Sequence, residues 1–125
     1  MQQKPLILAV DDEPSNLKLI SAALGEDFSL ALAKSAALAE QFLKRKKPSL
    51  ILLDIKMPEK DGLTFAEELM EGEETFSIPF IFITGLNDPE THRKARSLGA
   101  LGFVEKPFAP TMLKSYIREV FRDRI

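Results

Sequence analysis

The sequence predicts an α/β fold in which a doubly wound, five-stranded parallel sheet carries helices on both faces. Short apolar runs alternate five times with amphipathic stretches, which is the pattern of repeated βα units. Three of these runs, at residues 6–10, 50–53 and 80–83, are apolar throughout, as expected for strands that are buried on both faces. Right-handed crossovers between such strands place the intervening helices on both sides of the sheet.

The two remaining strands are expected at residues 28–33 and 101–104. In the first of them, Phe28, Leu30 and Leu32 alternate with less apolar residues, which predicts a strand at the edge of the sheet.

The helices are recognised by their apolar periodicity and by residues typical of helix ends. Pro14 suits a first helical turn, Ser35 is a candidate N-cap, and Gly25 and Gly99 are candidate C-terminal caps. Helices are therefore expected over residues 14–24, 35–46, 63–71, 88–98 and 111–122.

Length and composition predict one domain that spans residues 1–125, with 45% apolar and 29% charged residues. The chain has no cysteine, which excludes disulfides, thiolate metal sites and a cysteine nucleophile. No apolar run approaches the ~20 residues of a membrane span, and acidic residues interrupt the N-terminal run, so we expect a cytoplasmic protein that does not contact a membrane. The net charge of −2 gives no support for direct nucleic-acid binding.

Polar residues follow four of the predicted strands, at the point where each strand ends. Asp11 and Asp12 follow the first, Asp54 the third, Thr84 the fourth and Lys106 the fifth. Because parallel strands end at one edge of their sheet, these residues are expected to converge there. Each residue alone has an ordinary explanation, such as an acid that caps a helix, but their coincidence predicts a functional site.

This set of side chains suits a divalent cation and a phosphoryl group. Two carboxylates ~4 Å apart repel by roughly 4 kcal/mol at an effective dielectric constant near 20, so they need a counter-charge from Lys106 or a cation. Oxygen ligands without cysteine or a nearby histidine favour Mg²⁺, with Mn²⁺ as an alternative, over zinc. A carboxylate can then attack phosphorus to form an aspartyl phosphate, and Gly85 leaves space beside Thr84.

The chain resembles the receiver domain of the two-component response regulator family over essentially its whole length. The resemblance implies the flavodoxin-like strand order 2-1-3-4-5. Its motifs are Val10-Asp-Asp-Glu-Pro14, Leu52-Leu-Asp-Ile-Lys-Met-Pro58 followed by Asp61-Gly62, Ile83-Thr-Gly85, and Phe103-Val-Glu-Lys-Pro-Phe108.

Carried over residue by residue, the resemblance assigns the acidic positions first. Asp54 would accept the phosphoryl group. Asp12 and Asp54 would bind Mg²⁺ directly, Asp11 would bind it mainly through water, and Lys56 would contribute its backbone carbonyl.

The other motif positions would bind the phosphoryl group or report its presence. Thr84 would form a hydrogen bond with a phosphoryl oxygen, Gly85 would belong to the same phosphoryl-binding set, and Lys106 would form an ion pair with that oxygen. The peptide bond between Lys106 and Pro107 would be cis. Phe103 matches the mobile aromatic residue of the family, and a plain core phenylalanine is an equally good interpretation of this position.

The resemblance implies a signalling domain and not an enzyme, apart from catalysis of its own phosphorylation and dephosphorylation. Its partner would be a histidine kinase or a histidine phosphotransfer protein. Its output would be a change in the face formed by residues 88–98, 101–104 and 111–122, with a homodimer through that face as one outcome. The sequence does not distinguish a stand-alone regulator from part of a longer regulator or hybrid kinase.

Two alternatives belong to other functional classes. A receiver-like interaction module would keep the fold without phosphate signalling, and the intact set of polar residues argues against it. A Mg²⁺-dependent phosphatase usually needs a second aspartate near the nucleophile and a cap, but Lys56 lies two residues after Asp54 and the chain is short.

Overall fold

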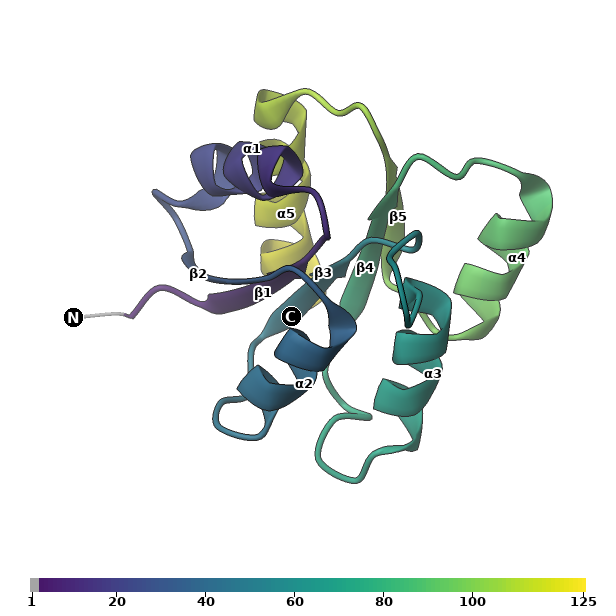
Figure 1. The fold of residues 1–125 in the computed structure, drawn as a ribbon. Helices are drawn as coiled ribbons and strands as arrows, with labels where there is room; N and C mark the ends of the chain where they lie inside the picture. The colour runs from purple at the N-terminus through teal and green to yellow at the C-terminus, as the bar shows by residue number, and fades with distance from the viewer. Residues whose placement is uncertain (1–2) are drawn as a thin grey trace.

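A computed structural model describes residues 3–125, which include a five-stranded, fully parallel sheet (Figure 1). The strand order is β2-β1-β3-β4-β5, so the expected order is confirmed, as is the edge position of β2. The central strands β1, β3 and β4 are almost completely buried. The strands are β1 (Leu6–Val10), β2 (Ser29–Ala33), β3 (Leu50–Leu53), β4 (Phe80–Thr84) and β5 (Gly102–Glu105).

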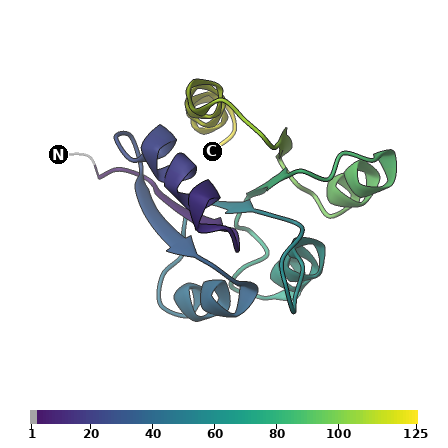
Figure 2. The same cartoon turned by 45° about the horizontal axis from the view of Figure 1, so that its top comes forward.

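Helices cover both faces of the sheet, as predicted. Figure 2 shows α1 and α5 on one side and α2, α3 and α4 on the other. Each side has its own apolar core, formed by alternate residues of the same strands. The helices are α1 (Pro14–Leu24), α2 (Ala36–Leu43), α3 (Gly62–Glu71), α4 (Pro89–Ser97) and α5 (Pro110–Asp123). None of them, within the part of the chain that is described, is long and apolar enough to cross a membrane.

The largest correction to the predicted boundaries is at the end of α2. This helix ends at Leu43, whereas the sequence predicted a helix that continued to Lys46. The backbone N–H groups of Arg45 and Lys46 both donate to the carbonyl of Phe42, so the last turn tightens and the helix stops. Pro48 then favours extended backbone before β3.

The strands β4 and β5 each end one residue later than predicted, and β5 also begins one residue later. Thr84 pairs with Glu105, so the ladder continues to the residues that follow the apolar runs. This pairing places Thr84 inside a strand, where its backbone position is fixed.

The start of α3 lies directly against the end of β3. The Gly62 N–H donates to the Ile55 carbonyl at 2.7 Å, and the Asp61 side chain caps α3 by accepting from the Thr64 N–H at 2.8 Å. A Cβ atom on Gly62 would collide with the carbonyl oxygen of Asp54. Glycine at this position therefore allows the helix to begin close to Asp54.

We expect Gly62→Ala to destabilise the fold by about 2 kcal/mol, because the new methyl group would meet rigid backbone atoms. Alanine is the better helix former, so helix propensity cannot explain a loss. Gly85→Ala is the control, because no atom lies within 4 Å of a Cβ built there. Urea denaturation should show a change of only about 0.5 kcal/mol or less for that variant. Equal losses in the two variants would contradict the collision.

Candidate functional site

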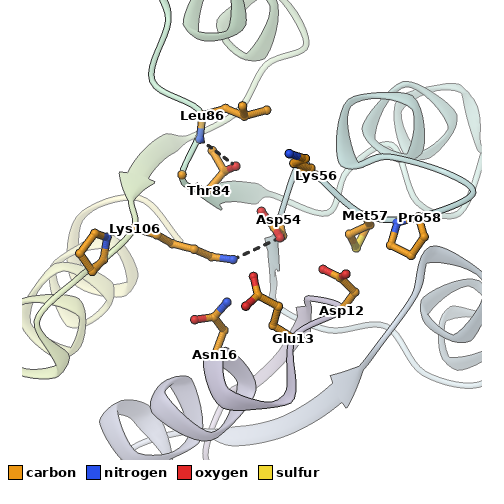
Figure 3. A pocket seen from close by; sticks show the side chains of 12 residues that line it. Asp12, Glu13, Asn16, Asp54, Lys56, Met57, Pro58, Thr84, Leu86 and Lys106 are labelled. Carbon is orange, nitrogen blue, oxygen red and sulfur yellow. Dashed lines mark hydrogen bonds and ion pairs between the residues drawn. The ribbon is translucent and has the colours of Figure 1, made fainter.

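A cavity of about 890 Å³ opens at the carboxyl edge of the sheet (Figure 3). It lies between the ends of β3 and β4 and the first turn of α1. Residues from all four of the predicted polar strand ends line it. The predicted site residues that line it are Asp12, Asp54, Lys56, Thr84, Gly85, Lys106 and Pro107.

Asp54 follows β3 and lies at the floor of the cavity, where its side chain is only 5% exposed. Its backbone N–H donates to the carbonyl of Val10 at 3.0 Å, which extends the pairing between β1 and β3. Burial, and then the negative charge of Asp11, raises the pKa of the Asp54 carboxyl, while Lys106 and the Thr84 hydroxyl oppose this rise. Asp54 is thus an acid whose ionised form depends on nearby positive charge.

Asp11 lies beneath the cavity, and both of its carboxylate oxygens already have donors. Oδ2 accepts from the Lys106 ammonium at 2.6 Å, and Oδ1 accepts from the Glu13 N–H at 2.9 Å. Its neighbour Asp12 is half-buried and lines the cavity. Asp12 is therefore the more available of the pair for a direct ligand bond.

Lys106 lies between the two buried acids. Its Nζ is 2.6 Å from Asp11 Oδ2 and 3.1 Å from Asp54 Oδ2 (Figure 3 shows the second pair). Burial acts to lower the pKa of Lys106, but the hydrogen bond with Asp11 and the charge of Asp54 outweigh this effect and raise it. The ammonium is thus held in its charged form, and the Lys106–Pro107 bond is cis, the isomer that the resemblance implies.

Thr84 is buried at the end of β4, on the other side of Asp54 from Asp12 (Figure 3). Its Oγ1 accepts from the backbone N–H of Leu86 at 3.3 Å, which is a long hydrogen bond. The following Gly85 leaves the adjacent space open. The Thr84 hydroxyl therefore has room to exchange the Leu86 N–H for another hydrogen-bond partner.

The acidic residues meet the requirements of a site for a hard divalent cation. One carboxylate oxygen from each of Asp11, Asp12 and Asp54 lies within 4.8 Å of the others. Ligands on opposite sides of an octahedral Mg²⁺ ion are about 4 Å apart, so small side-chain shifts would suffice. Lys56, whose carbonyl was predicted as a further ligand, also borders the cavity. An all-oxygen donor set of this kind fits Mg²⁺.

Phe103 lies away from the cavity, beneath α4. Its ring is half-buried, 6.5 Å between centroids from Phe82, and it packs at the margin of the core. The ring of His92 stacks on it at 3.9 Å between centroids, and His92 Nε2 lies 3.1 Å from Asn87 Oδ1. His92 is half-buried and covers Phe103.

Sequence reasoning also missed Glu13 and Asn16, which line the cavity beside Asp12. Their position in the sequence could have indicated that they line the cavity. Residues in the first turn of a helix that follows a strand lie at the carboxyl edge of the sheet, where the cavity opens.

The chain belongs to the response regulator receiver domain family, because the sequence model of that family matches residues 7–118. Members of this family are signalling domains of two-component systems.

The chain is 36% identical over 118 residues to a probable cyclic di-GMP phosphodiesterase of Vibrio cholerae, a match that covers 94% of this chain and 27% of that protein. It is 33% identical over 116 residues to response regulator Rre1 of Synechocystis, which covers 91% of this chain and 50% of that protein. The chain therefore spans about a quarter to a half of the curated relatives it matches.

Among solved structures, the fold is similar to that of the chemotaxis protein CheY4 of Vibrio cholerae. The TM-score is 0.83 at 26% identity, and the match covers 92% of this chain and 98% of that chain. Both the family match and this similarity confirm the predicted receiver fold.

Lys106→Met should lower the free energy of unfolding by about 3 kcal/mol at pH 7 in the presence of a chelator, because it leaves two buried carboxylates without their cation. A raised folded-state pKa means that ionised Asp54 costs stability, and this cost disappears as the pH falls and the carboxyl is protonated. The deficit of the variant should therefore shrink between pH 7 and pH 5 in urea titrations.

Lys114→Met is the matched control, since Lys114 pairs with the exposed Glu26 at 3.8 Å. It should change stability by about 0.5 kcal/mol or less at either pH. A deficit of Lys106→Met that did not depend on pH would contradict this account of the site.

Proposed function

We propose that the chain is a phosphorylation-controlled switch in which Asp54 accepts a phosphoryl group from a histidine kinase or histidine phosphotransfer protein. The observation that supports this most strongly is the position of Asp54, at the floor of an open cavity with Lys106 beside it and two further carboxylates close by. Mg²⁺ would be the cofactor, with Mn²⁺ as an alternative.

Asp54 would act as the nucleophile. An oxygen of its carboxylate attacks phosphorus, the bond between phosphorus and the donor's histidine nitrogen breaks, and that nitrogen leaves with the electron pair and later takes up a proton. Lys106 favours the ionised form of Asp54 before transfer and pairs with a phosphoryl oxygen afterwards.

The cation would be held by Asp12, Asp54 and the Lys56 carbonyl, with Asp11 acting through water because its own oxygens already accept two hydrogen bonds. When bound, Mg²⁺ would neutralise part of the charge on the transferring phosphoryl group.

Phosphorylation replaces the −1 charge of the Asp54 carboxylate with about −1.5 to −2 on the phosphoryl group, beside the Thr84 hydroxyl. Thr84 would release the Leu86 N–H and donate to a phosphoryl oxygen, in the space that Gly85 leaves open. Phe103, which lies in the strand beside β4, would then repack, and the α4–β5–α5 face would change its shape.

A small-molecule phosphodonor with Mg²⁺ should add the mass of one phosphoryl group to the wild-type chain and none to Asp54→Asn, as intact-mass spectrometry would show. Asp61→Asn is the control, because Asp61 caps α3 and asparagine caps about as well as aspartate. That variant should be labelled like the wild type. Equal labelling of Asp54→Asn would refute the assignment of the acceptor, and a wild type without labelling or Mg²⁺ binding would favour a phosphate-independent interaction module.

We infer that residues 1–125 act as one receiver unit in the cytoplasm, that this unit contacts neither nucleic acid nor membrane directly, and that its α4–β5–α5 face binds a second copy of the chain. Arg93 and Arg96 are exposed on α4, and Lys94, also exposed, pairs with Glu67 of α3 at 3.0 Å.

We expect the phosphodonor to shift the chain from monomer towards dimer, measured by size-exclusion chromatography with light scattering. Asp54→Asn should show no shift under the same conditions. A shift in both variants would mean that the donor acts elsewhere, and no shift in labelled wild type would exclude dimerisation as the output of this chain.

A further inference from the structure

The loop between β3 and α3 forms one wall of the cavity. It begins at Asp54 and includes Lys56, whose carbonyl is a proposed ligand. Its first half is anchored from inside, because the side chains of Ile55 and Met57 are buried in the core. The N–H of Gly62 closes the loop on the Ile55 carbonyl at 2.7 Å.

The tip of this loop has an unfavourable backbone conformation. Glu59 has φ +68°, and the Lys60 N–H donates to the Pro58 carbonyl at 2.9 Å, which is a γ-turn of the rare, positive-φ form. Non-glycine residues adopt such a conformation only where surrounding contacts hold it. Pro58 and Glu59 are exposed, so the core does not supply those contacts.

Lys60 supplies contacts at the tip. Its Nζ lies 2.8 Å from Glu40 Oε1 on α2 and 2.5 Å from Glu68 Oε1 on α3. Hydrogen bonds with Glu40 and then Glu68 raise the pKa of Lys60, so its charge is retained at neutral pH. One ammonium group thus joins the loop tip to two helices that cover the same face of the sheet.

A contribution to folding stability does not explain why this contact is present. Exposed ion pairs contribute little to the free energy of folding, and the three side chains are 31% to 46% exposed. Lys94 and Glu67 form a similar exposed pair between α4 and α3 at 3.0 Å, but that pair includes no loop of the cavity. The Lys60 contact differs because it joins a loop that lines the cavity to two helices.

We propose that Lys60 is a positioning residue that, through Glu40 and Glu68, holds the β3–α3 loop in the form that binds the divalent cation. Lys60 itself would touch neither cation nor phosphoryl group. It acts through the backbone, four residues after Lys56. This inference rests on the proposed Mg²⁺-dependent function of the cavity.

The test compares Lys60→Met with Lys94→Met, because each removes one ammonium group from an exposed ion pair. Substitutions of residues that orient metal ligands weaken binding by 10–100-fold, and Lys60 is one step further away, so we expect the Mg²⁺ Kd of Lys60→Met to rise by about 3–10-fold in calorimetry. The Kd of Lys94→Met should equal that of the wild type, and the two variants should have similar Tm values.

Two further measurements separate positioning from general destabilisation. In the metal-free protein, hydrogen exchange of the Lys60 and Gly62 amides should accelerate in Lys60→Met and stay unchanged in Lys94→Met. Lys60→Arg, which keeps the charge, should restore most of the affinity for Mg²⁺, and saturating Mg²⁺ should restore the phosphorylation rate of Lys60→Met.

The inference is overturned if Lys60→Met binds Mg²⁺ as the wild type does, or if Lys94→Met weakens binding equally. In either case wild-type binding and phosphorylation would still support the proposed function. A wild type that binds no Mg²⁺ would overturn both.

Discussion

The position of the Lys106 ammonium between Asp11 and Asp54 is the constraint on which the cavity depends. These residues follow three different strands, and Lys106 and Asp11 are 95 positions apart in the sequence. Without the ammonium, two buried carboxylates would repel each other at the end of the sheet. Apolar replacements of buried ion pairs are often as stable, so stability alone does not account for this arrangement.

The parallel sheet explains why so much of this site could be predicted. Asp54 follows the buried strand β3 and Thr84 is the last residue of the buried strand β4, so their position at one edge of the sheet follows from the parallel direction of the strands. The order of the strands was predicted from the family resemblance. The stacking of His92 on Phe103 and the contact of Lys60 with Glu40 could not be predicted in this way. They depend on side-chain conformations of residues on separate helices and loops, which no local pattern specifies.

The predicted ends of one helix and one strand were wrong. No apolar residue lies between Leu43 and Pro48, so the apolar pattern does not locate the end of α2, and the tightened turn on the Phe42 carbonyl ends this helix at Leu43. Conversely, the polar character of Thr84 suggested the end of a strand, while pairing with Glu105 keeps it within β4. In both places hydrogen bonding of the backbone, and not the apolar pattern, sets the boundary.

The two walls of the cavity differ in how firmly they are held, and this difference agrees with the proposed division of roles. The β3–α3 loop is anchored by buried Ile55, by the close approach of Gly62 and by Lys60 at its tip. The opposite wall has open space at Gly85 and one long hydrogen bond at Thr84. A cation site benefits from a wall with fixed geometry, since ligands that are already in place need no reordering. A switch needs a wall with a second available arrangement.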